Sequence, residues 1–352
     1  MNNTAKKLVL TLGMLLLTTS CTTTSNSADN IQQRTKATKV TNSTSTTPIK
    51  VDGSSTVYPI TQAVVKAYQA DPGNKSQVQV NISGTSGGFE KFCAGKTDIS
   101  NASRPINQSE MAACKKNGIS YIELPIAFDA LTIAVNPQNT WAKDITVAEL
   151  KKIWEPGAEG KITKWNQVRA SWPDLPIKLY GAGDKSGTFD YFTEAIVGKA
   201  KASRKDYTAS EDDEVLVAGI SKDSSALGYF GYAYYAENKD KLKVLAVNNG
   251  KEAILPSPET VEKAKYQPLS RPLFIYVNLW SSQNKTVVYK FADFYIKNAA
   301  KTAVSVGYVP LSEEAYKLDY VHLYKGKVGT VFGGKSEFKL TLGELLRKQK
   351  QF

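Results

Sequence analysis

The chain is poor in the residues that build most catalytic and metal centres. Its 352 residues include one histidine, His322, and three cysteines, Cys21, Cys93 and Cys114. A zinc site needs several such ligands, and a Ser–His or Cys–His pair needs a histidine beside the nucleophile, so neither is easily built. The segment GDKSG lacks the G-x-S-x-G spacing of hydrolases, and GAGDKSGT does not match a P-loop. We therefore expect no enzyme, no metal and no cofactor.

The N-terminus lacks an apolar run long enough to span a bilayer permanently. Lys6 and Lys7 precede the short run Leu8–Leu17, which is typical of an export signal. The segment LLTTSC resembles a lipoprotein processing site with Cys21 as the lipidated first mature residue, although Thr18 stands where such sites usually carry leucine. Plain cleavage nearby is the alternative. We expect a signal peptide in residues 1–21 and a flexible tether rich in serine and threonine in residues 22–48.

No basic run is interleaved with aromatic residues, so a nucleic-acid surface is not expected despite a formal net charge of +12. Lysine is scattered and is balanced by nearby aspartate and glutamate along most of the chain. Such a diffuse positive field raises the encounter rate with anions. The length exceeds one typical hydrophobic core, which favours two lobes.

Apart from Cys21, the cysteines form an even pair in a chain expected to be exported. A disulfide between Cys93 and Cys114 would close a short loop, as is common outside the cytoplasm. Two buried free thiols are the alternative.

Three stretches rich in hydroxyl groups and glycine precede segments with helical apolar spacing. They are GSSTVYP at Gly53–Pro59, GTSGGFEKF at Gly84–Phe92 and DKSGTFDYF at Asp184–Phe192. Free N–H groups at a helix start, the positive end of the helix dipole and neighbouring hydroxyls together make an anion site. Each stretch alone is compatible with ordinary helix capping or a tight turn. The three together indicate one oxyanion held from several sides.

The body alternates between short strands and helices. Val78–Ile82, Ala127–Asn136 and Ile177–Tyr180 have strand patterns, whereas Val147–Ile153 and Thr286–Ala300 have helical ones. This alternation predicts α/β layers with largely parallel strands.

The same stretches carry a resemblance to a known family. In order from about Ile49 to Leu311, the strings GSSTVYPI, GTSGGFEKFCAGKTDISNASRPI, KITKWNQV, KSGTFDYFTEAI, ALGYFGYAYY and GYVPL resemble the phosphate-binding receptor of ABC-type phosphate importers. The PstS/SphX-type branch known from cyanobacteria is the most similar. The resemblance implies a two-lobe periplasmic-binding-protein fold, type II-like, with inorganic phosphate in a cleft between lobes joined by crossing strands. It also implies a periplasmic monomer, anchored through Cys21, that serves ABC permease subunits in the inner membrane.

The resemblance also places the lobes. Residues 49–126 and 269–320 are expected to form the first lobe, residues 127–268 the second, and residues 321–352 a C-terminal tail. The hinge is then expected near Ala127–Leu131 and Pro268–Pro272.

Ligand positions are carried over from the family loop by loop. The first loop gives a hydroxyl and a backbone N–H, the second gives a hydroxyl after its first glycine, and the third matches without a gap. The corresponding residues here are Ser55, Thr56, Thr85, Ser86, Ser186, Gly187 and Thr188.

Two departures rearrange the charges. Ser103 stands where the best-known members carry an aspartate that accepts a phosphate proton, and Ala182 stands where they carry an arginine. Arg104, beside Ser103, is our candidate guanidinium, because its planar donors suit a tetrahedral oxyanion. Asp129 is our candidate proton acceptor, with Asp213 as a weaker contender.

The proton acceptor decides which anion is bound, because phosphate near neutral pH keeps a P–OH hydrogen and sulfate does not. A receptor for another oxyanion, such as sulfate or molybdate, is the nearest alternative. A phosphate sensor or scavenger without transport also stays open.

Overall fold

The computed structural model describes residues 48–352. The expected signal peptide, Cys21 and nearly all of the expected tether lie outside the described residues. Within the described part, no helix is both long and apolar enough to cross a membrane.

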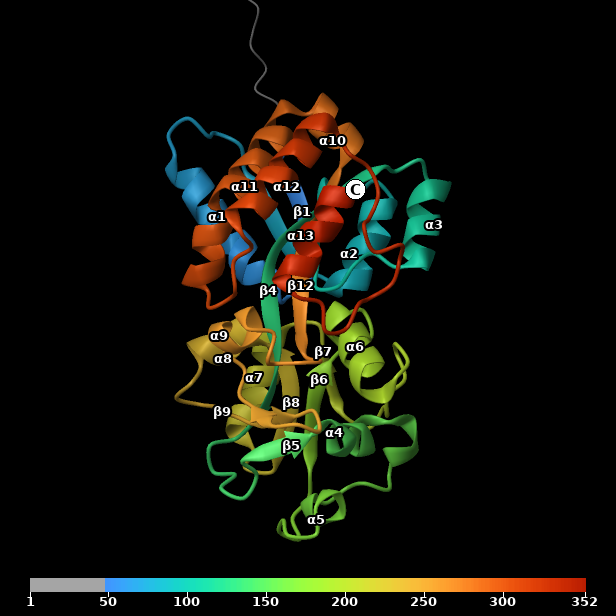
Figure 1. Ribbon diagram of the computed structural model, residues 1–352, viewed down its shortest axis with the longest axis vertical. Helices are drawn as coiled ribbons and strands as arrows, with labels where there is room; N and C mark the ends of the chain where they lie inside the picture. The colour runs from blue at the N-terminus through green and yellow to red at the C-terminus, as the bar shows by residue number, and fades with distance from the viewer. Residues whose placement is uncertain (1–47) are drawn as a thin grey trace, which may run out of the picture. The chain divides into compact units, whose positions relative to one another are not determined.

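Three parallel strands with their helices form the first lobe, the upper half of Figure 1. The strands are β1 (Ile49–Gly53), β2 (Val78–Ile82) and β3 (Ile99–Ala102). The helices are α1 (Tyr58–Ala70), α2 (Gly84–Cys93), α3 (Gln108–Lys116), α10 (Leu279–Asn284), α11 (Thr286–Ser305), α12 (Glu313–Lys325) and α13 (Leu342–Gln351).

A second group of strands and helices forms the second lobe, the lower half of Figure 1. Its main strands are β6 (Lys178–Ala182), β7 (Thr208–Ser210), β8 (Ala226–Gly231) and β9 (Lys243–Val244). A small sheet contains β5 (Asp144–Thr146), β10 (Ala246–Asn248) and β11 (Ala253–Ile254). The helices are α4 (Val147–Trp154), α5 (Trp165–Val168), α6 (Gly187–Phe192), α7 (Asp213–Lys222), α8 (Tyr232–Glu237) and α9 (Pro258–Glu262), with a 3-10 turn at Pro156–Ala158 and a π turn at Thr193–Val197.

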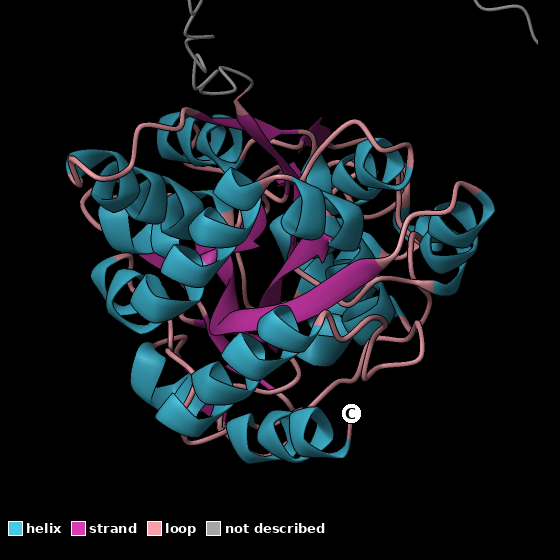
Figure 2. Cartoon of the chain, turned by 90° about the horizontal axis from the view of Figure 1, so that it is seen from above, coloured by secondary structure: helices cyan, strands magenta, loops and turns pink. Residues whose placement is uncertain are grey.

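Two long strands run from one lobe into the other. They are β4 (Tyr121–Val135) and β12 (Ser270–Asn278), and every residue in both is buried. The first part of β4 pairs with β12 and its last part pairs with β8, so the sheet order is β2-β1-β3-β12-β4-β8-β6-β7. Seen from above in Figure 2, helices surround these central strands. The two-lobe α/β architecture with crossing strands is therefore as expected.

The expectation of largely parallel strands is right for β1–β3 in the first lobe and for β6–β8 in the second, and it is wrong for β9 and at the crossing. There β12 is antiparallel to both β3 and β4, and β4 is antiparallel to β8. Pro125 does not end the strand, because the register shifts between Leu273 and Phe274 on the partner strand, beside Pro125. An irregularity of this kind tolerates a residue that has no N–H to donate.

The residues expected as a C-terminal tail contain the end of one helix and the whole of another. Helix α12 runs through residue 320 to Lys325, where Gly326 ends it in a left-handed conformation. Helix α13 packs on α12, and the side-chain amide of Gln349 donates to Asp319 at 2.7 Å. Residues 321–352 therefore add to the first lobe, because α13 has an apolar side to bury.

Candidate anion-binding site

The three hydroxyl-rich stretches are the starts of α1, α2 and α6, as the sequence predicts. No side chain caps the start of α1 or of α2. In α6 the hydroxyl of Ser186 accepts a hydrogen bond from the N–H of Thr188 at 3.1 Å. Ordinary capping therefore accounts for the serine of the third stretch. It does not account for the hydroxyl residues at the starts of α1 and α2.

These helix starts meet at the beginning of α6. The hydroxyl oxygens of Thr56 and Thr188 are 3.1 Å apart, which joins α1 to α6 across the two lobes. A Cβ atom at Gly187 would lie 2.3 Å from Thr85 Oγ1 and 2.7 Å from Ser103 Oγ. Only glycine lets α6 approach α2 this closely. The buried hydroxyls of the first and second lobes thus share one layer between the lobes.

Arg271 on β12 reaches the centre of this layer, and the sequence reasoning did not identify it. Its side chain is fully buried. Nη2 donates to Thr188 Oγ1 at 2.9 Å, to Thr56 Oγ1 at 3.2 Å and to Asp129 Oδ2 at 2.9 Å. Nε also donates to Asp129 Oδ2, at 3.1 Å. Nη1 is buried and has no hydrogen-bond partner among the residues that the structure describes.

A signal for Arg271 was present in the sequence. The residue stands in LSRPLFIYV, an apolar run typical of a buried strand. A charge in such a run needs a partner or a ligand, because burying an unpaired ion is costly. Its partner Asp129 lies 142 residues away, and no local spacing indicates that pairing.

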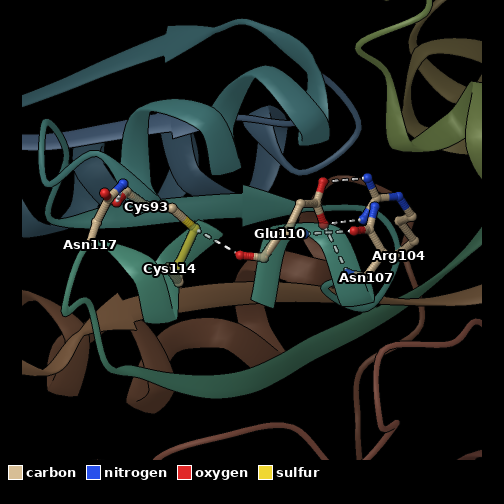
Figure 3. Close-up of a disulfide and its surroundings, with 6 residues drawn as sticks. All are labelled: Cys93, Arg104, Asn107, Glu110, Cys114 and Asn117. Atoms are coloured by element: carbon tan, nitrogen blue, oxygen red, sulfur yellow. Dashed lines mark hydrogen bonds and ion pairs between the residues drawn. A yellow bond between two sulfur atoms is a disulfide. The ribbon is translucent and has the colours of Figure 1, made fainter. Parts of the chain in front are cut away.

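Arg104 is buried beside the same layer, but all its donors are taken by the protein. Nε donates to Asp190 at 2.8 Å, Nη1 to the carbonyl of Pro105 and to Glu110, and Nη2 to Ser86 and to Glu110. Figure 3 shows the paired contact with Glu110. Burial alone would lower the pKa of Arg104, but the hydrogen bonds and charges of Glu110 and Asp190 raise it. In this arrangement the guanidinium ties α2, α3 and α6 together.

Asp129 is saturated by its protein partners. Its Oδ1 accepts from the N–H of Tyr232 at 3.0 Å, and its Oδ2 accepts twice from Arg271. Burial raises the pKa of Asp129, and the charge of Arg271 partly offsets that effect.

Asp213, at the start of α7, has a different environment. The hydroxyl of Ser55 donates to Oδ1 at 3.2 Å, and the N–H of Gly231 lies 3.4 Å from Oδ2. No lysine or arginine of residues 48–352 forms a salt bridge with this carboxyl group. Burial raises its pKa to about 7, against an ordinary value of 3.8. It is thus the acid in this layer whose charge is least compensated.

The structure buries every predicted ligand residue at the junction of the lobes. Their role in binding stays a prediction. Ser103 has no carboxyl group to accept a phosphate proton. Its N–H and hydroxyl both lie within hydrogen-bond distance of Thr85 Oγ1. The expected disulfide between Cys93 and Cys114 is present and joins the end of α2 to α3.

Comparison with known proteins places the chain in a family. A family model described as "PBP superfamily domain" matches residues 26–299. Protein SphX of Synechocystis sp. is 58% identical over 306 residues, which cover 86% of this chain and 90% of SphX. The phosphate-binding protein PstS of Staphylococcus haemolyticus is 37% identical over 277 residues, 78% of this chain and 85% of PstS. The chain belongs to the SphX/PstS family of the PBP superfamily.

Solved structures agree with this family assignment. A possible phosphate-binding protein from Planctomyces limnophilus is 45% identical, with a TM-score of 0.58 over 80% of this chain and 99% of that one. A putative phosphate ABC transporter substrate-binding protein from Clostridium perfringens, solved with bound phosphate, is 24% identical and has a TM-score of 0.63 over 76% of this chain and 100% of that one. The chain thus has the two-lobe periplasmic-binding-protein fold.

Proposed function

We propose that this protein is an extracytoplasmic receptor that binds inorganic phosphate between its two lobes and delivers it to the permease of an ABC-type importer. One observation carries the proposal. The buried Nη1 of Arg271 has no hydrogen-bond partner within residues 48–352, and it lies in a layer of hydroxyls supplied by three helix starts. A planar guanidinium edge beside hydroxyls and open helix N-termini suits a tetrahedral oxyanion. The names of the SphX/PstS relatives support phosphate as that oxyanion.

In this proposal Arg271 supplies the guanidinium that the family usually places at the position of Ala182. The hydroxyls and backbone N–H groups of the helix starts and of the loop after β3 supply the remaining donors: Ser55, Thr56, Thr85, Ser86, Ser103, Ser186, Gly187 and Thr188. Arg104 does not contact the phosphate in this proposal, because its N–H groups already bind residues of three helices and hold those helices in position.

The acid that accepts the phosphate proton is then Asp213 rather than Asp129. Asp129 is neutralised by Arg271, whereas Asp213 shares the cluster through Ser55 and has no cation of its own. A carboxyl group whose pKa lies near 7 shares one proton with phosphate, and it repels sulfate, which brings no proton.

The lobes are proposed to be residues 49–126 with 269–320 and the packed C-terminal residues, and residues 127–268. The hinge would lie where β4 and β12 cross, near Ala127–Leu131 and Pro268–Pro272. Closure brings donors from both lobes onto one ion and removes water from charge-assisted hydrogen bonds. We further propose a periplasmic monomer that binds no nucleic acid and is anchored through a lipidated Cys21.

Isothermal titration calorimetry of the purified protein with phosphate, sulfate and molybdate tests the proposal. We expect one phosphate site and at least tenfold weaker binding of sulfate, as for a site in which a buried acid repels the wrong anion. A clear preference for sulfate or molybdate would reassign the receptor to that anion. Turnover of a chromogenic phosphate ester would instead indicate an enzyme.

Two matched variants distinguish the roles of the two acids. Asp213→Asn is expected to lose most of the discrimination against sulfate. Asp129→Asn is expected to weaken the binding of phosphate and of sulfate alike, because it disturbs Arg271. The opposite pattern would return the role of proton acceptor to Asp129. Co-purification of a membrane permease with the native protein separates an import receptor from a sensor or scavenger.

A further inference from the structure

Residues 330–341, which we call the strap, lie outside the matched family model, which ends at residue 299. The strap connects α12 to α13, and both its ends are fixed to the first lobe. At its beginning the N–H of Val331 donates to Glu123 of β4 at 3.0 Å, and Phe332 packs edge-on against Phe274 of β12, with ring centroids 5.5 Å apart. At its end Thr341 caps α13.

The strap also passes close to α3 of the first lobe. Gly334 has a φ of +81°, and a Cβ atom there would lie 2.7 Å from Cγ of Gln108. The chain can approach α3 this closely only with glycine at this position.

The middle of the strap contacts the second lobe. The ring of Phe338 lies 5.1 Å from the ring of Tyr191 in α6. Since both flanks of the strap belong to the first lobe, this contact links the lobes. Figure 1 shows this red segment passing from the first lobe down toward α6.

Tyr191 connects the strap to the proposed anion site. Its hydroxyl donates to the carbonyls of Pro268 at 3.1 Å and Ser270 at 2.8 Å, directly before Arg271 on β12. The guanidinium carbon of Arg271 lies 5.8 Å from the centroid of the Tyr191 ring. Thr188, which accepts from Arg271, is one turn earlier on the same helix. A displacement of Tyr191 would therefore shift both Arg271 and Thr188.

The contact between the strap and the second lobe is small. A cavity of about 660 Å³ lies between the last part of the strap and that lobe, lined by Phe338, Lys339 and Thr341 on one side and by Ala195, Gln267 and Pro268 on the other. A segment that only covered the core would pack closely along its length. Here the contact between Phe338 and Tyr191 connects the strap to the second lobe, and a contact this small can form and break.

We propose that Phe338 is a positioning residue for the anion site, and that the strap is a further non-covalent link between the lobes, beside the two crossing strands and the side-chain contacts of the anion site. It favours the closed arrangement and holds Tyr191, and through it Arg271, in place. The inference rests on the proposed function for its affinity effect but not for its effect on lobe opening.

The test compares Phe338→Ala with Phe352→Ala. Phe352 is also an aromatic residue of the C-terminal part, but its ring packs on His322 and beneath Lys327, both in the first lobe. We expect Phe338→Ala to raise the phosphate Kd and the release rate in stopped flow by about 2- to 12-fold, the range for losing one aromatic pair, with the association rate unchanged. Phe352→Ala should change neither the Kd nor the release rate. Phe338→Tyr, which keeps an aromatic ring, should have the Kd and the release rate of the unmodified protein.

Lobe opening is measured separately, without phosphate. Spin labels on Lys66→Cys in α1 and Lys161→Cys in the second lobe, in a Cys21→Ser background, report the distance between the lobes. Phe338→Ala should shift this distribution toward longer distances, and Phe352→Ala should not. An unchanged distribution together with an unchanged Kd in the folded Phe338→Ala protein would overturn the proposal. If the unmodified protein binds no phosphate, the proposed function is wrong. The distance measurement alone then shows whether the strap links the lobes.

Discussion

At the scale of single residues, the pair of Arg271 and Asp129 is central. Both side chains are fully buried, and they join β12 to β4 where the two strands cross. Removing one partner of such a pair leaves an uncompensated charge and costs about 3–5 kcal/mol, so the guanidinium is firmly held. Its free edge is therefore already oriented before a ligand arrives.

Replacing Arg271 by lysine keeps the charge and removes the planar fork. We expect Arg271→Lys to raise the phosphate Kd about 10- to 100-fold, because at least one charge-assisted hydrogen bond is lost. Titration calorimetry checks this, with Arg204→Lys as control. Arg204 is equally buried, but it pairs with Asp206 in the second lobe. If Arg104→Lys abolished binding and Arg271→Lys did not, our assignment of the two arginines would be reversed.

Asp213 should give the ligand-free protein a distinct pH dependence. Its pKa is raised to about 7, so between its ordinary value of 3.8 and pH 7 the folded state keeps a proton that the unfolded state loses. This stabilisation is complete below about pH 4 and disappears as the pH rises through 7. The difference corresponds to roughly 4 kcal/mol.

Urea unfolding between pH 4.5 and 8 measures that loss. Asp213→Asn should flatten the fall in unfolding free energy with rising pH. Part of the slope should remain, because burial also raises the pKa values of Glu123 and Glu211 to about 7. An identical slope in the variant and the unmodified protein would contradict the raised pKa.

At the scale of elements, the site depends on how closely helix starts approach one another. Gly187 allows α6 to meet α2, and a methyl group there would overlap the hydroxyl of Thr85. We expect Gly187→Ala to weaken phosphate binding at least tenfold and to lower stability by about 1–3 kcal/mol, as overpacking does. Gly157→Ala is the control, since nothing lies within 4 Å of a Cβ atom there. Calorimetry and urea unfolding of both variants measure the difference, and equal behaviour of the two would refute the packing argument.

The disulfide acts on α3, which also carries Glu110, the partner of Arg104 (Figure 3). It joins residues 21 positions apart, and closing a loop of this length contributes about 3 kcal/mol. We expect the double variant Cys93→Ser with Cys114→Ser to lose about that much unfolding free energy. Phosphate affinity should change little, because Asp190 and Ser86 still hold Arg104. A large affinity loss with unchanged stability would show that α3 itself belongs to the site.

At the scale of the whole molecule, local patterns in the sequence predict several of the elements and three of the positions where helices begin. The starts of α1, α2 and α6 follow from hydroxyls and glycine before apolar spacing, and α11 follows from its amphipathic repeat. The crossing of the lobes was expected only through the family resemblance.

Features that depend on long-range packing were not predictable in the same way. The pairing of Arg271 with Asp129 decides which arginine has free donors, and it arises only when β4 and β12 align. The sequence favours Arg104 because it stands beside Ser103 and its planar donors suit an oxyanion, but Glu110 and Asp190 occupy those donors in the fold. The packing of residues 321–352 on the first lobe likewise depends on contacts such as that of Gln349 with Asp319.

The most direct test of the central claim is a crystal structure of the protein with phosphate. We expect one tetrahedral ion between the lobes, within hydrogen-bond distance of Nη1 of Arg271 and of hydroxyls from both lobes, such as Ser55 and Ser186. An ion bound elsewhere, or one held by Arg104 while Arg271 makes no contact, would contradict it.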